Sequence, residues 1–381
     1  MTDDTSSRRR FLALGGATAA GSLAGCFGLF SNDTTNQVGV SLSDFRGSGP
    51  LVESRGDPGG TSIQDLPPLE GDLTVYVGGG EGGLYLDLLS LFEQAYDNFN
   101  VEQSVKGSSS LANTIIEENE NNATQADVFM SVDAGSLGAV ANAGATQSLP
   151  SEALNAVPNS FQDGDGRWVG FAGRARAIPY NTNTLSESDI PNSVHDFPDT
   201  GALEGTMGWA PTYGAFQSFI TAMRLNRSDD AARSWLNEMQ NHGVTEYGNE
   251  FAVSNSAADG ELAAGFANHY YSLRVRSDRP NAPLDLAFTE GDAGALVNVS
   301  GLEILDGTNK SELAGNFVRH VLSSEAQEFF ATRTFAYPMI SGVAPVGGLP
   351  RIDDLNPPDI DLTELADVSG TVDLMRDAGV L

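Results

Sequence analysis

The chain has 381 residues, of which 40 % are hydrophobic and 8 % aromatic, so it can bury a sizeable core and is not disordered throughout. Its 51 acidic residues against 20 basic ones give a formal net charge of −31, which excludes a nucleic acid partner because phosphate binding relies on Lys and Arg. A single cysteine excludes an internal disulfide and a cysteine-based zinc site.

The first residues of the chain have the features of an export signal. The arginines of Ser7–Leu12 precede an apolar stretch, Leu12–Ala24, that is rich in Ala and Gly and too short to span a bilayer. This order is typical of a twin-arginine signal. Leu23–Cys26 follows at once and resembles a lipobox, whose cysteine becomes the lipid-bearing first residue of the mature protein. We predict a twin-arginine lipoprotein signal over residues 1–26, lipidated at Cys26; the alternative is a free thiol after an uncleaved start.

The next segment, residues 27–70, consists mainly of Gly, Ser, Asp, Thr and Pro. Its scattered apolar residues follow no sustained period of 2 or 3.6. The composition predicts a flexible tether between the lipid and the folded body.

From residue 71 onward, predicted strands and helices alternate. Short apolar runs indicate strands, and apolar residues that recur three and four positions apart indicate helices. The expected strands are 73–77, 126–130, 177–180 and 295–299, and the expected helices are 84–99, 136–143, 229–239, 261–268 and 313–330, the last interrupted near residues 323–324. This alternation predicts an α/β architecture, and its length predicts two lobes.

Familiar catalytic motifs are absent from the sequence. It contains no HExxH zinc pattern, no phosphate-binding P-loop and no GxSxG nucleophile elbow. The glycine run at 78–83 lacks the rest of a dinucleotide-binding fingerprint, and the four histidines are scattered. Pairs of carboxylates in so acidic a chain indicate a solvated surface. The sequence therefore favours a binding protein over an enzyme.

The cluster Asn268-His269-Tyr270-Tyr271 is the most distinctive polar feature. Adjacent tyrosines after a short apolar helix are most often core and rim aromatics. The alternative is a pair of phenolate ligands for Fe(III), a small hard cation that prefers anionic oxygen and lowers the pKa of a bound acid. Adjacent side chains of a strand point apart, so both rings reach one cleft only at the irregular end of a helix. The residues alone leave core packing and iron binding both open.

A set of short stretches appears in a characteristic order and spacing along most of the chain. They are Val75–Gly78, Ala126–Phe129, Gly173–Arg176, Thr212–Phe216, Asn268–Tyr271, Gly294–Val297 and Ala336–Pro338. With them the chain from Leu73 to Leu381 resembles the periplasmic ferric-ion-binding proteins of ABC importers, a branch of the type II periplasmic-binding-protein fold.

The resemblance implies a two-lobed α/β fold with a ligand cleft between the lobes. The chain would cross between the lobes at hinges near residues 173–180 and 292–299. The implied divisions are a first lobe of residues 71–172 and 300–340, a second lobe of residues 173–299, and a C-terminal segment, 341–381, packed on both.

The resemblance also implies ligands for the metal. Tyr270 and Tyr271 match the family's two phenolate ligands. The chain departs from the family at three positions, with Gly80 and Val132 where several members have histidine and glutamate, and Tyr213 where the anion loop has serine. The oxygen donors offered at or beside these positions are Glu81, Asp133 and Tyr213.

A second set of residues matches the family's anion site. Thr212, Gly214 and Ala215 match a loop whose backbone N–H groups and hydroxyl hold carbonate or phosphate at a helix N-terminus. Arg174 matches an arginine that faces the anion in some members, and Asn268 matches a residue beside it. The anion would complete the coordination of the iron.

The function implied by the resemblance is that of an extracytoplasmic substrate-binding lipoprotein. It would capture Fe(III), close around it and deliver it to the permease of an ABC importer, without a catalytic cofactor. We expect a monomer held on the outer face of the cell membrane by the lipid on Cys26. The acid excess and the presence of only two lysines are similar to proteins of extreme halophiles and imply a haloarchaeal source.

Two other functions remain open at this stage. The same fold would serve for thiamine, an oxyanion such as molybdate, or a polyamine, for which Trp209, Tyr213 and Asp133 offer aromatic faces and an acidic end. A secreted lipoprotein enzyme would need a nucleophile with a base, or His and Cys metal ligands, and neither is visible in the sequence.

Overall fold

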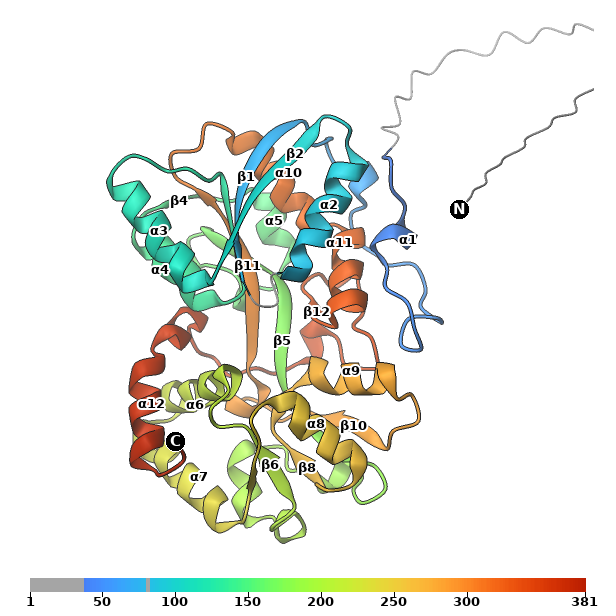
Figure 1. Cartoon of the computed structure of the whole chain (residues 1–381), viewed down its shortest axis with the longest axis vertical. Coiled ribbons are helices and arrows are strands. Elements are labelled where there is room, and N and C mark those ends of the chain that lie inside the picture. The colour runs from blue at the N-terminus through green and yellow to red at the C-terminus, as the bar shows by residue number, and fades with distance from the viewer. Residues whose placement is uncertain (1–37, 80–82) are drawn as a thin grey trace, which may run out of the picture. The chain divides into compact units, whose positions relative to one another are not determined.

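The first lobe is an α/β layer structure. The computed structural model describes residues 38–79 and 83–381 (Figure 1). In the first lobe β1 pairs in parallel with β2 and β3, and β3 pairs antiparallel with β11. Its strands are β1 (Gly71–Gly78), β2 (Phe99–Lys106), β3 (Val128–Ser131), β4 (Thr146–Gln147) and β12 (Tyr337–Pro338). Its helices are α2 (Tyr85–Ala95), α3 (Ser108–Glu120), α4 (Ala134–Asn142), α5 (Ser151–Ala156), α10 (Ser311–Val321) and α11 (Ser324–Phe329).

The second lobe has a smaller mixed sheet. In it β8 pairs in parallel with β6, and β6 pairs in parallel with β7. Its strands are β6 (Met207–Trp209), β7 (Thr245–Glu246), β8 (Ala264–Gly265), β9 (Ala267–Asn268) and β10 (Leu284–Ala287). Its helices are α6 (Gly214–Asn226), α7 (Asp229–Asn241), α8 (Glu250–Asp259) and α9 (His269–Asp278), and Figure 1 shows α6 and α9 on the side that faces the first lobe.

Two long strands, β5 (Trp168–Asn181) and β11 (Val297–Leu305), connect the lobes (Figure 1). The first half of β5 pairs antiparallel with β11, and its second half pairs with β9, β10 and β8 of the second lobe. These strands pass through the two regions where the resemblance implies crossings. The predicted α/β, two-lobed fold is thus confirmed, whereas the residue limits of each lobe remain a prediction.

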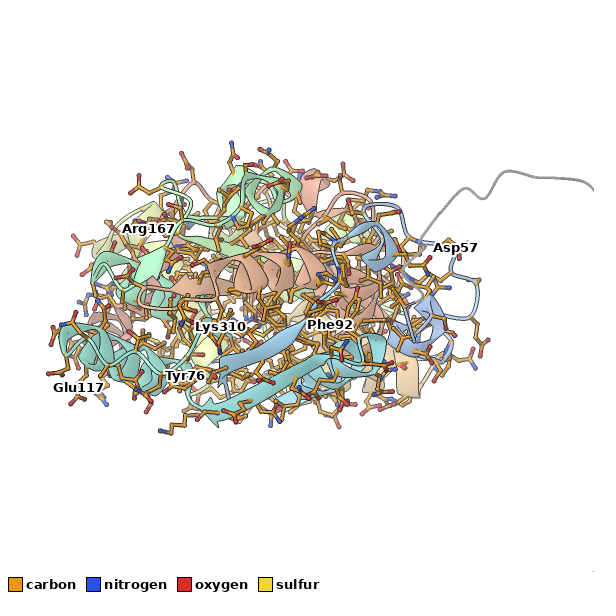
Figure 2. The ribbon with its side chains drawn as sticks, turned by 90° about the horizontal axis from the view of Figure 1, so that it is seen from above. Asp57, Tyr76, Phe92, Glu117, Arg167 and Lys310 are labelled. Atoms are coloured by element: carbon orange, nitrogen blue, oxygen red, sulfur yellow. The ribbon has the colours of Figure 1, made fainter. Side chains whose placement is uncertain are left out.

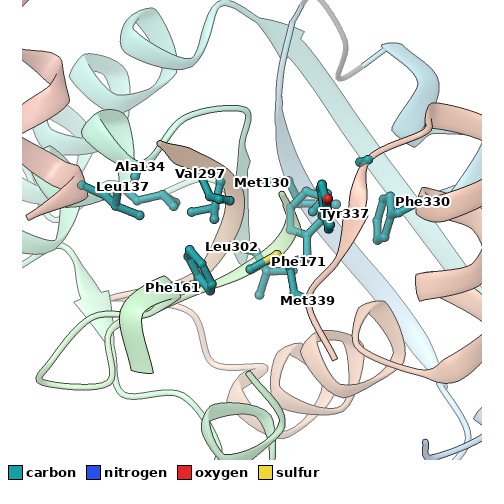
Figure 3. Packing of buried hydrophobic residues seen from close by; sticks show 14 of the residues in the cluster. Met130, Ala134, Leu137, Phe161, Phe171, Val297, Leu302, Phe330, Tyr337 and Met339 are labelled. Atoms are coloured by element: carbon teal, nitrogen blue, oxygen red, sulfur yellow. The ribbon is translucent and has the colours of Figure 1, made fainter. Parts of the chain in front are cut away.

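The core of the first lobe fixes one face of β5. The ring of Phe171 lies 4.9 Å from that of Phe330 and 5.1 Å from that of Tyr85, measured between centroids. Figure 3 shows Phe171 close to Tyr337 and Met339, with Phe330 beside them. Gly173 permits this approach, because a Cβ there would lie only 3.0 Å from the Cβ of Tyr337. Side chains alternate along a strand, so residues 174 and 176 face away from this core.

Charged side chains cover the surface. In Figure 2 Asp57 and Glu117 lie at the periphery, whereas Phe92 lies in the interior. Lys310, one of the two lysines, pairs with Asp127 at 3.0 Å. Within residues 38–79 and 83–381, no helix combines the length and the apolar character needed to cross a membrane.

Residues 38–70 differ from the flexible tether predicted for 27–70. They contain α1 (Leu42–Phe45) and pack on the first lobe through buried apolar side chains, which are Phe45, Val52, Ile63, Leu66 and Leu69. Arg46 and Arg55 each place Nε 2.7 Å from the carboxylate of Glu328 on α11, whose side chain is only 1 % exposed. A few well-placed apolar residues and one shared buried carboxylate therefore order a segment whose composition predicts disorder. Residues 27–37 and the predicted signal, including Cys26, lie outside the described residues.

The helix predicted over residues 261–268 is also wrong. α8 ends at Asp259, and Gly260 follows at φ +78°, in the left-handed region that glycine adopts without strain. The chain then forms β8 and β9, whose small apolar residues pair with β6 and β5. The two tyrosines of the distinctive cluster consequently lie at the start of a helix, not at the end of one. The other predicted strands and helices are present with shifted ends.

Candidate metal centre

A cavity of about 490 Å³ is lined by residues of both lobes and of the crossing strands. The first lobe contributes Gly79, Val132 and Asp133, and β5 contributes Arg174 and Arg176. The second-lobe and β11 lining includes Tyr213, Gly214, Ala215, Gln217, Ser218, Asn268, Tyr270 and Asn298. The volume is in the range of small-molecule binding sites.

Three tyrosines cluster on the second-lobe side of the site, and two of them line this cavity. Tyr270 and Tyr271 occupy the first turn of α9, where successive side chains point about 100° apart. Tyr270 lines the cavity, and Tyr271 lines a neighbouring one. Tyr213, the N-cap residue of α6, lines both, and its hydroxyl is hydrogen-bonded to that of Tyr271. The structure thus brings together three of the predicted metal ligands.

Arg274 covers the two tyrosines of α9. Its guanidinium carbon lies 5.1 Å from the ring centroid of Tyr270 and 5.6 Å from that of Tyr271. Positions three and four residues apart adjoin on a helix surface, so this contact follows from the helical spacing. The two rings are themselves 4.3 Å apart. A cation stacked on two buried aromatic rings is attracted by their faces and fixes their orientation.

A buried polar network positions the start of α9. Arg176, 3 % exposed, forms an ion pair with Glu250 and donates to Oδ1 of Asn268 at 3.2 Å. Glu250 in turn accepts the backbone N–H of Asn268 at 2.8 Å, and the amide of Asn268 donates to the hydroxyl of Tyr270 at 3.4 Å. Sequence analysis missed Arg176 and Glu250. The signal for Arg176 was its spacing of two from Arg174, which places both on one face of a strand.

Most of the residues predicted to bind the anion line the cavity, and one does not. Gly214 and Ala215 form the first turn of α6, whose N–H groups lack helical partners, and they line the cavity. Asn268 and Arg174 also line it, and Arg174 donates to the carbonyl of Val132. Thr212 is exposed and does not line the cavity. Arg176 has one buried guanidinium nitrogen, Nη2, with no hydrogen-bond partner among the described residues.

The first-lobe side of the cavity offers fewer donors. Asp133 is the N-cap residue of α4, where its carboxylate accepts from the backbone N–H of Ser136 at 2.7 Å and from its hydroxyl at 3.2 Å. Glu81, the other predicted first-lobe ligand, lies outside the described residues. Among the residues that are described, no group of three or more His, Cys, Asp and Glu could hold a metal ion.

His269 and Trp209 belong to the framework of the site. His269 is fully buried, and its ring nitrogens contact the backbone of Ala175 at 3.2 Å and the carbonyl of Phe335 at 2.8 Å. Burial lowers the pKa of His269 to about 4, so it is neutral at pH 7. Trp209 is buried against Phe216 and Trp235 and does not line the cavity, which removes an aromatic face from the polyamine alternative.

Comparison with known proteins identifies the family of this chain. Residues 123–358 match the model of a family described as bacterial extracellular solute-binding protein. The chain is 30 % identical over 289 residues to the major ferric iron-binding protein of Neisseria meningitidis serogroup B, an alignment covering 73 % of this chain and 84 % of that protein.

Two solved structures extend the comparison. Iron-bound HitA from Pseudomonas aeruginosa is 28 % identical with a TM-score of 0.66, over 81 % of this chain and 99 % of HitA. A Trichodesmium protein (IdiA, FutA) in complex with iron and citrate is 25 % identical with a TM-score of 0.68, over 82 % of this chain and 100 % of that one. With its two-lobed fold and interlobe cavity, this chain belongs to the bacterial extracellular solute-binding proteins, and it is a binding protein rather than an enzyme.

Proposed function

We propose that this chain binds ferric iron in the cavity between its lobes and delivers it to the permease of an ABC importer. The observation that carries the proposal is the cluster of three tyrosines beside this cavity: the hydroxyls of Tyr213 and Tyr271 are hydrogen-bonded, and the ring of Tyr270, which lines the cavity with Tyr213, lies 4.3 Å from that of Tyr271. Fe(III) prefers anionic oxygen, and softer divalent ions gain much less from phenolates. The names of the relatives, which are ferric iron-binding proteins, support the same ligand.

The remaining coordination positions of the iron would be filled by a carbonate or phosphate. The donors for it are the N-terminal N–H groups of α6 at Gly214 and Ala215, with Arg174, Arg176 and Asn268 opposite. Nη2 of Arg176, which has no hydrogen-bond partner within residues 38–79 and 83–381, supports this role, because a buried N–H donor without an acceptor is costly. Two arginines thus line this cavity in a chain whose net charge is −31. Thr212 is left out of this set because it is exposed.

Capture of the iron would begin on the second lobe, where the tyrosines are already held together. Closure of the first lobe about β5 and β11 would then add contacts and give the permease a closed shape to recognise. Asp133 would hold α4 and contribute little to the metal, since its carboxylate already caps that helix. The role of Glu81 as a ligand remains a prediction.

The cellular setting is also proposed from the sequence. A twin-arginine signal over residues 1–26 and a lipid on Cys26 would hold a monomer on the outer face of the membrane. The lobe limits that we propose are 71–172 with 300–340 and 173–299, with residues 341–381 packed on both.

An absorbance titration tests the proposed ligand. The full-length chain, freed of metal, is titrated with ferric nitrilotriacetate, and we expect a visible phenolate-to-iron band that saturates at one ion per chain. The double variant Tyr270→Phe/Tyr271→Phe should lose the band. Tyr180→Phe, a buried tyrosine of the second lobe outside the cavity, is the matched control and should retain it. Absence of a band in the unmodified chain, together with a thermal shift produced by phosphate, thiamine or spermidine, would reassign the ligand.

A further inference from the structure

A second cavity, of about 400 Å³, adjoins the tyrosine cluster. It lies against the second lobe, between the starts of α6 and α8 and one side of α9. Its principal lining residues are Tyr213, Asn249, Phe251, Tyr271, Arg274 and Phe335. Four of its eight lining residues are aromatic, against two, Tyr213 and Tyr270, in the cavity lined by Arg174, Arg176 and Asp133.

The two cavities adjoin at Tyr213, one of the candidate iron ligands. Tyr213 lines both cavities, and its hydroxyl bonds to that of Tyr271 at their junction. An iron ion held by these hydroxyls would therefore have the second cavity within reach of its coordination sphere. A larger molecule bound to the iron would contact the aromatic side chains of the second cavity.

The aromatic lining is held in place by the fold. The ring centroid of Phe251 lies 6.3 Å from that of Tyr271, and the Phe251 side chain remains 38 % exposed at the mouth of the cavity. Phe335 has φ +58°, a left-handed conformation that bulky residues rarely adopt, and its carbonyl accepts a hydrogen bond from the buried His269. Strained residues of this kind concentrate at ligand sites.

The cationic lining residue of the second cavity lies against the tyrosine rings. Arg274 lines it and stacks on the tyrosine rings, and no carboxylate among the described residues pairs with its guanidinium. Asp278 also lines the cavity, but it is exposed, one helical turn beyond Arg274. A planar aromatic group with anionic oxygens fits these surroundings, because it stacks on rings and pairs with a guanidinium.

We propose that the iron is bound as a complex with an aromatic oxyanion chelator of the catecholate type, whose oxygens take the coordination positions of the iron in place of carbonate or phosphate and whose ring occupies this second cavity. The inference rests on the proposed function and deepens it by naming the class of the chelator. The ring would pack between Phe251, Phe335 and the Tyr213–Tyr271 pair, and Arg274 would face its anionic oxygens. An aliphatic chelator such as citrate would contact Arg274 but would not stack on the aromatic rings.

The test compares three forms of ferric iron on the full-length chain. These are iron delivered from nitrilotriacetate, ferric citrate, and the complex of iron with 2,3-dihydroxybenzoate, each measured by quenching of tryptophan fluorescence. Bound dihydroxybenzoate per iron is counted from its absorbance after desalting. We expect the unmodified chain to retain one dihydroxybenzoate with each iron.

Variants at the rim of the second cavity then distinguish binding of the chelator from binding of the metal. Phe251→Ala should raise the Kd of the dihydroxybenzoate complex about tenfold through loss of ring stacking and burial, and change the Kd of the other two forms less than about threefold. Leu225→Ala is the matched control, since Leu225 is also 38 % exposed but lines neither cavity. Arg274→Gln should weaken the dihydroxybenzoate complex more than Phe251→Ala does.

Two results would overturn the inference in different ways. Iron bound without retained dihydroxybenzoate, or an equal effect of Phe251→Ala on all three forms, would reject the aromatic chelator and leave the iron site standing. Failure of every form of iron to bind would reject the proposed function itself.

Discussion

The two walls of the interlobe cavity differ in the polar groups that they offer to a ligand. On the second-lobe wall, Tyr213 and Tyr271 face each other, and Tyr270 is held by Asn268, with Arg274 stacked above. On the first-lobe wall, the carboxylate of Asp133 is engaged as a helix cap, and Val132 and Gly79 offer no polar side chain. The comparison indicates that one lobe provides a preorganised site and the other mainly closes over it.

The largest expected effect concerns the tyrosines of the second lobe. Tyr271→Phe removes a hydroxyl that both contacts Tyr213 and is a proposed iron ligand, so iron affinity should fall at least about a hundredfold. Equilibrium dialysis against a competing chelator measures the change, and a melting temperature close to that of the unmodified chain shows that the variant is folded. A fall of less than about threefold would place the metal elsewhere.

A second prediction concerns the network behind the tyrosines. Arg176→Met leaves Glu250 buried without its charged partner, which should lower the free energy of unfolding by about 3–5 kcal/mol. The double variant Arg176→Met/Glu250→Leu removes both charges and should recover most of that loss, as measured by denaturant unfolding. A single variant no less stable than the double one would show that the ion pair is not what holds the start of α9.

Acidification tests one buried histidine in each lobe, His269 at the start of α9 and His320 on α10. Burial lowers the pKa of each to about 4, from an ordinary value near 6.5 that holds in the unfolded chain. The unfolded chain therefore binds more protons between these values. The free energy of unfolding should be fully present above about pH 6.5 and fall toward pH 4, by up to about 3 kcal/mol per histidine.

Replacement of one histidine measures how much of the loss of unfolding free energy at low pH is due to that histidine. Denaturant unfolding at pH 7 and pH 4.5 should show a smaller loss for His320→Asn than for the unmodified chain, because the variant has one fewer group to protonate. Identical losses in the two proteins would contradict the buried neutral state of His320, whose Nε2 lies 2.7 Å from the hydroxyl of Tyr96.

The smallest effects are expected on the first-lobe wall. Asp133→Ser keeps a capping oxygen at the start of α4 and should leave stability nearly unchanged, whereas Asp133→Ala should cost about 1 kcal/mol. Iron affinity should change less than about threefold in both. A tenfold loss of affinity in Asp133→Ser would make Asp133 a ligand and would remove the contrast between the two walls.

Much of the fold follows from the sequence, because its elements carry local signals. The apolar run at 126–130 and the helical spacing after Ser228 depend on nearby residues and predict β3 and α7 correctly. The helix predicted over residues 261–268 was wrong because small apolar residues are compatible with both a helix and a strand. Here pairing with distant strands favours the strand. The tether predicted over residues 38–70 was wrong because the order of this segment depends on Glu328, which lies 282 positions from Arg46 and 273 from Arg55.

The site was predictable only in part. The tyrosines of α9 were found through a resemblance, since adjacent tyrosines alone are most often core and rim residues. Arg176 and Glu250 were missed because they are separated by 74 positions, and only the fold shows that they meet behind Asn268. The aromatic cavity beside Tyr271 was missed for the same reason, since Phe251 and Phe335 come from distant segments.

The central claim is that the tyrosine hydroxyls of the second lobe hold the iron. Crystals of the chain grown with excess ferric salt, measured at the iron absorption edge, test it most directly. We predict one strong anomalous peak within bonding distance of the hydroxyls of Tyr213, Tyr270 and Tyr271. An empty cavity, or a peak surrounded by carboxylates elsewhere on the chain, would contradict the account.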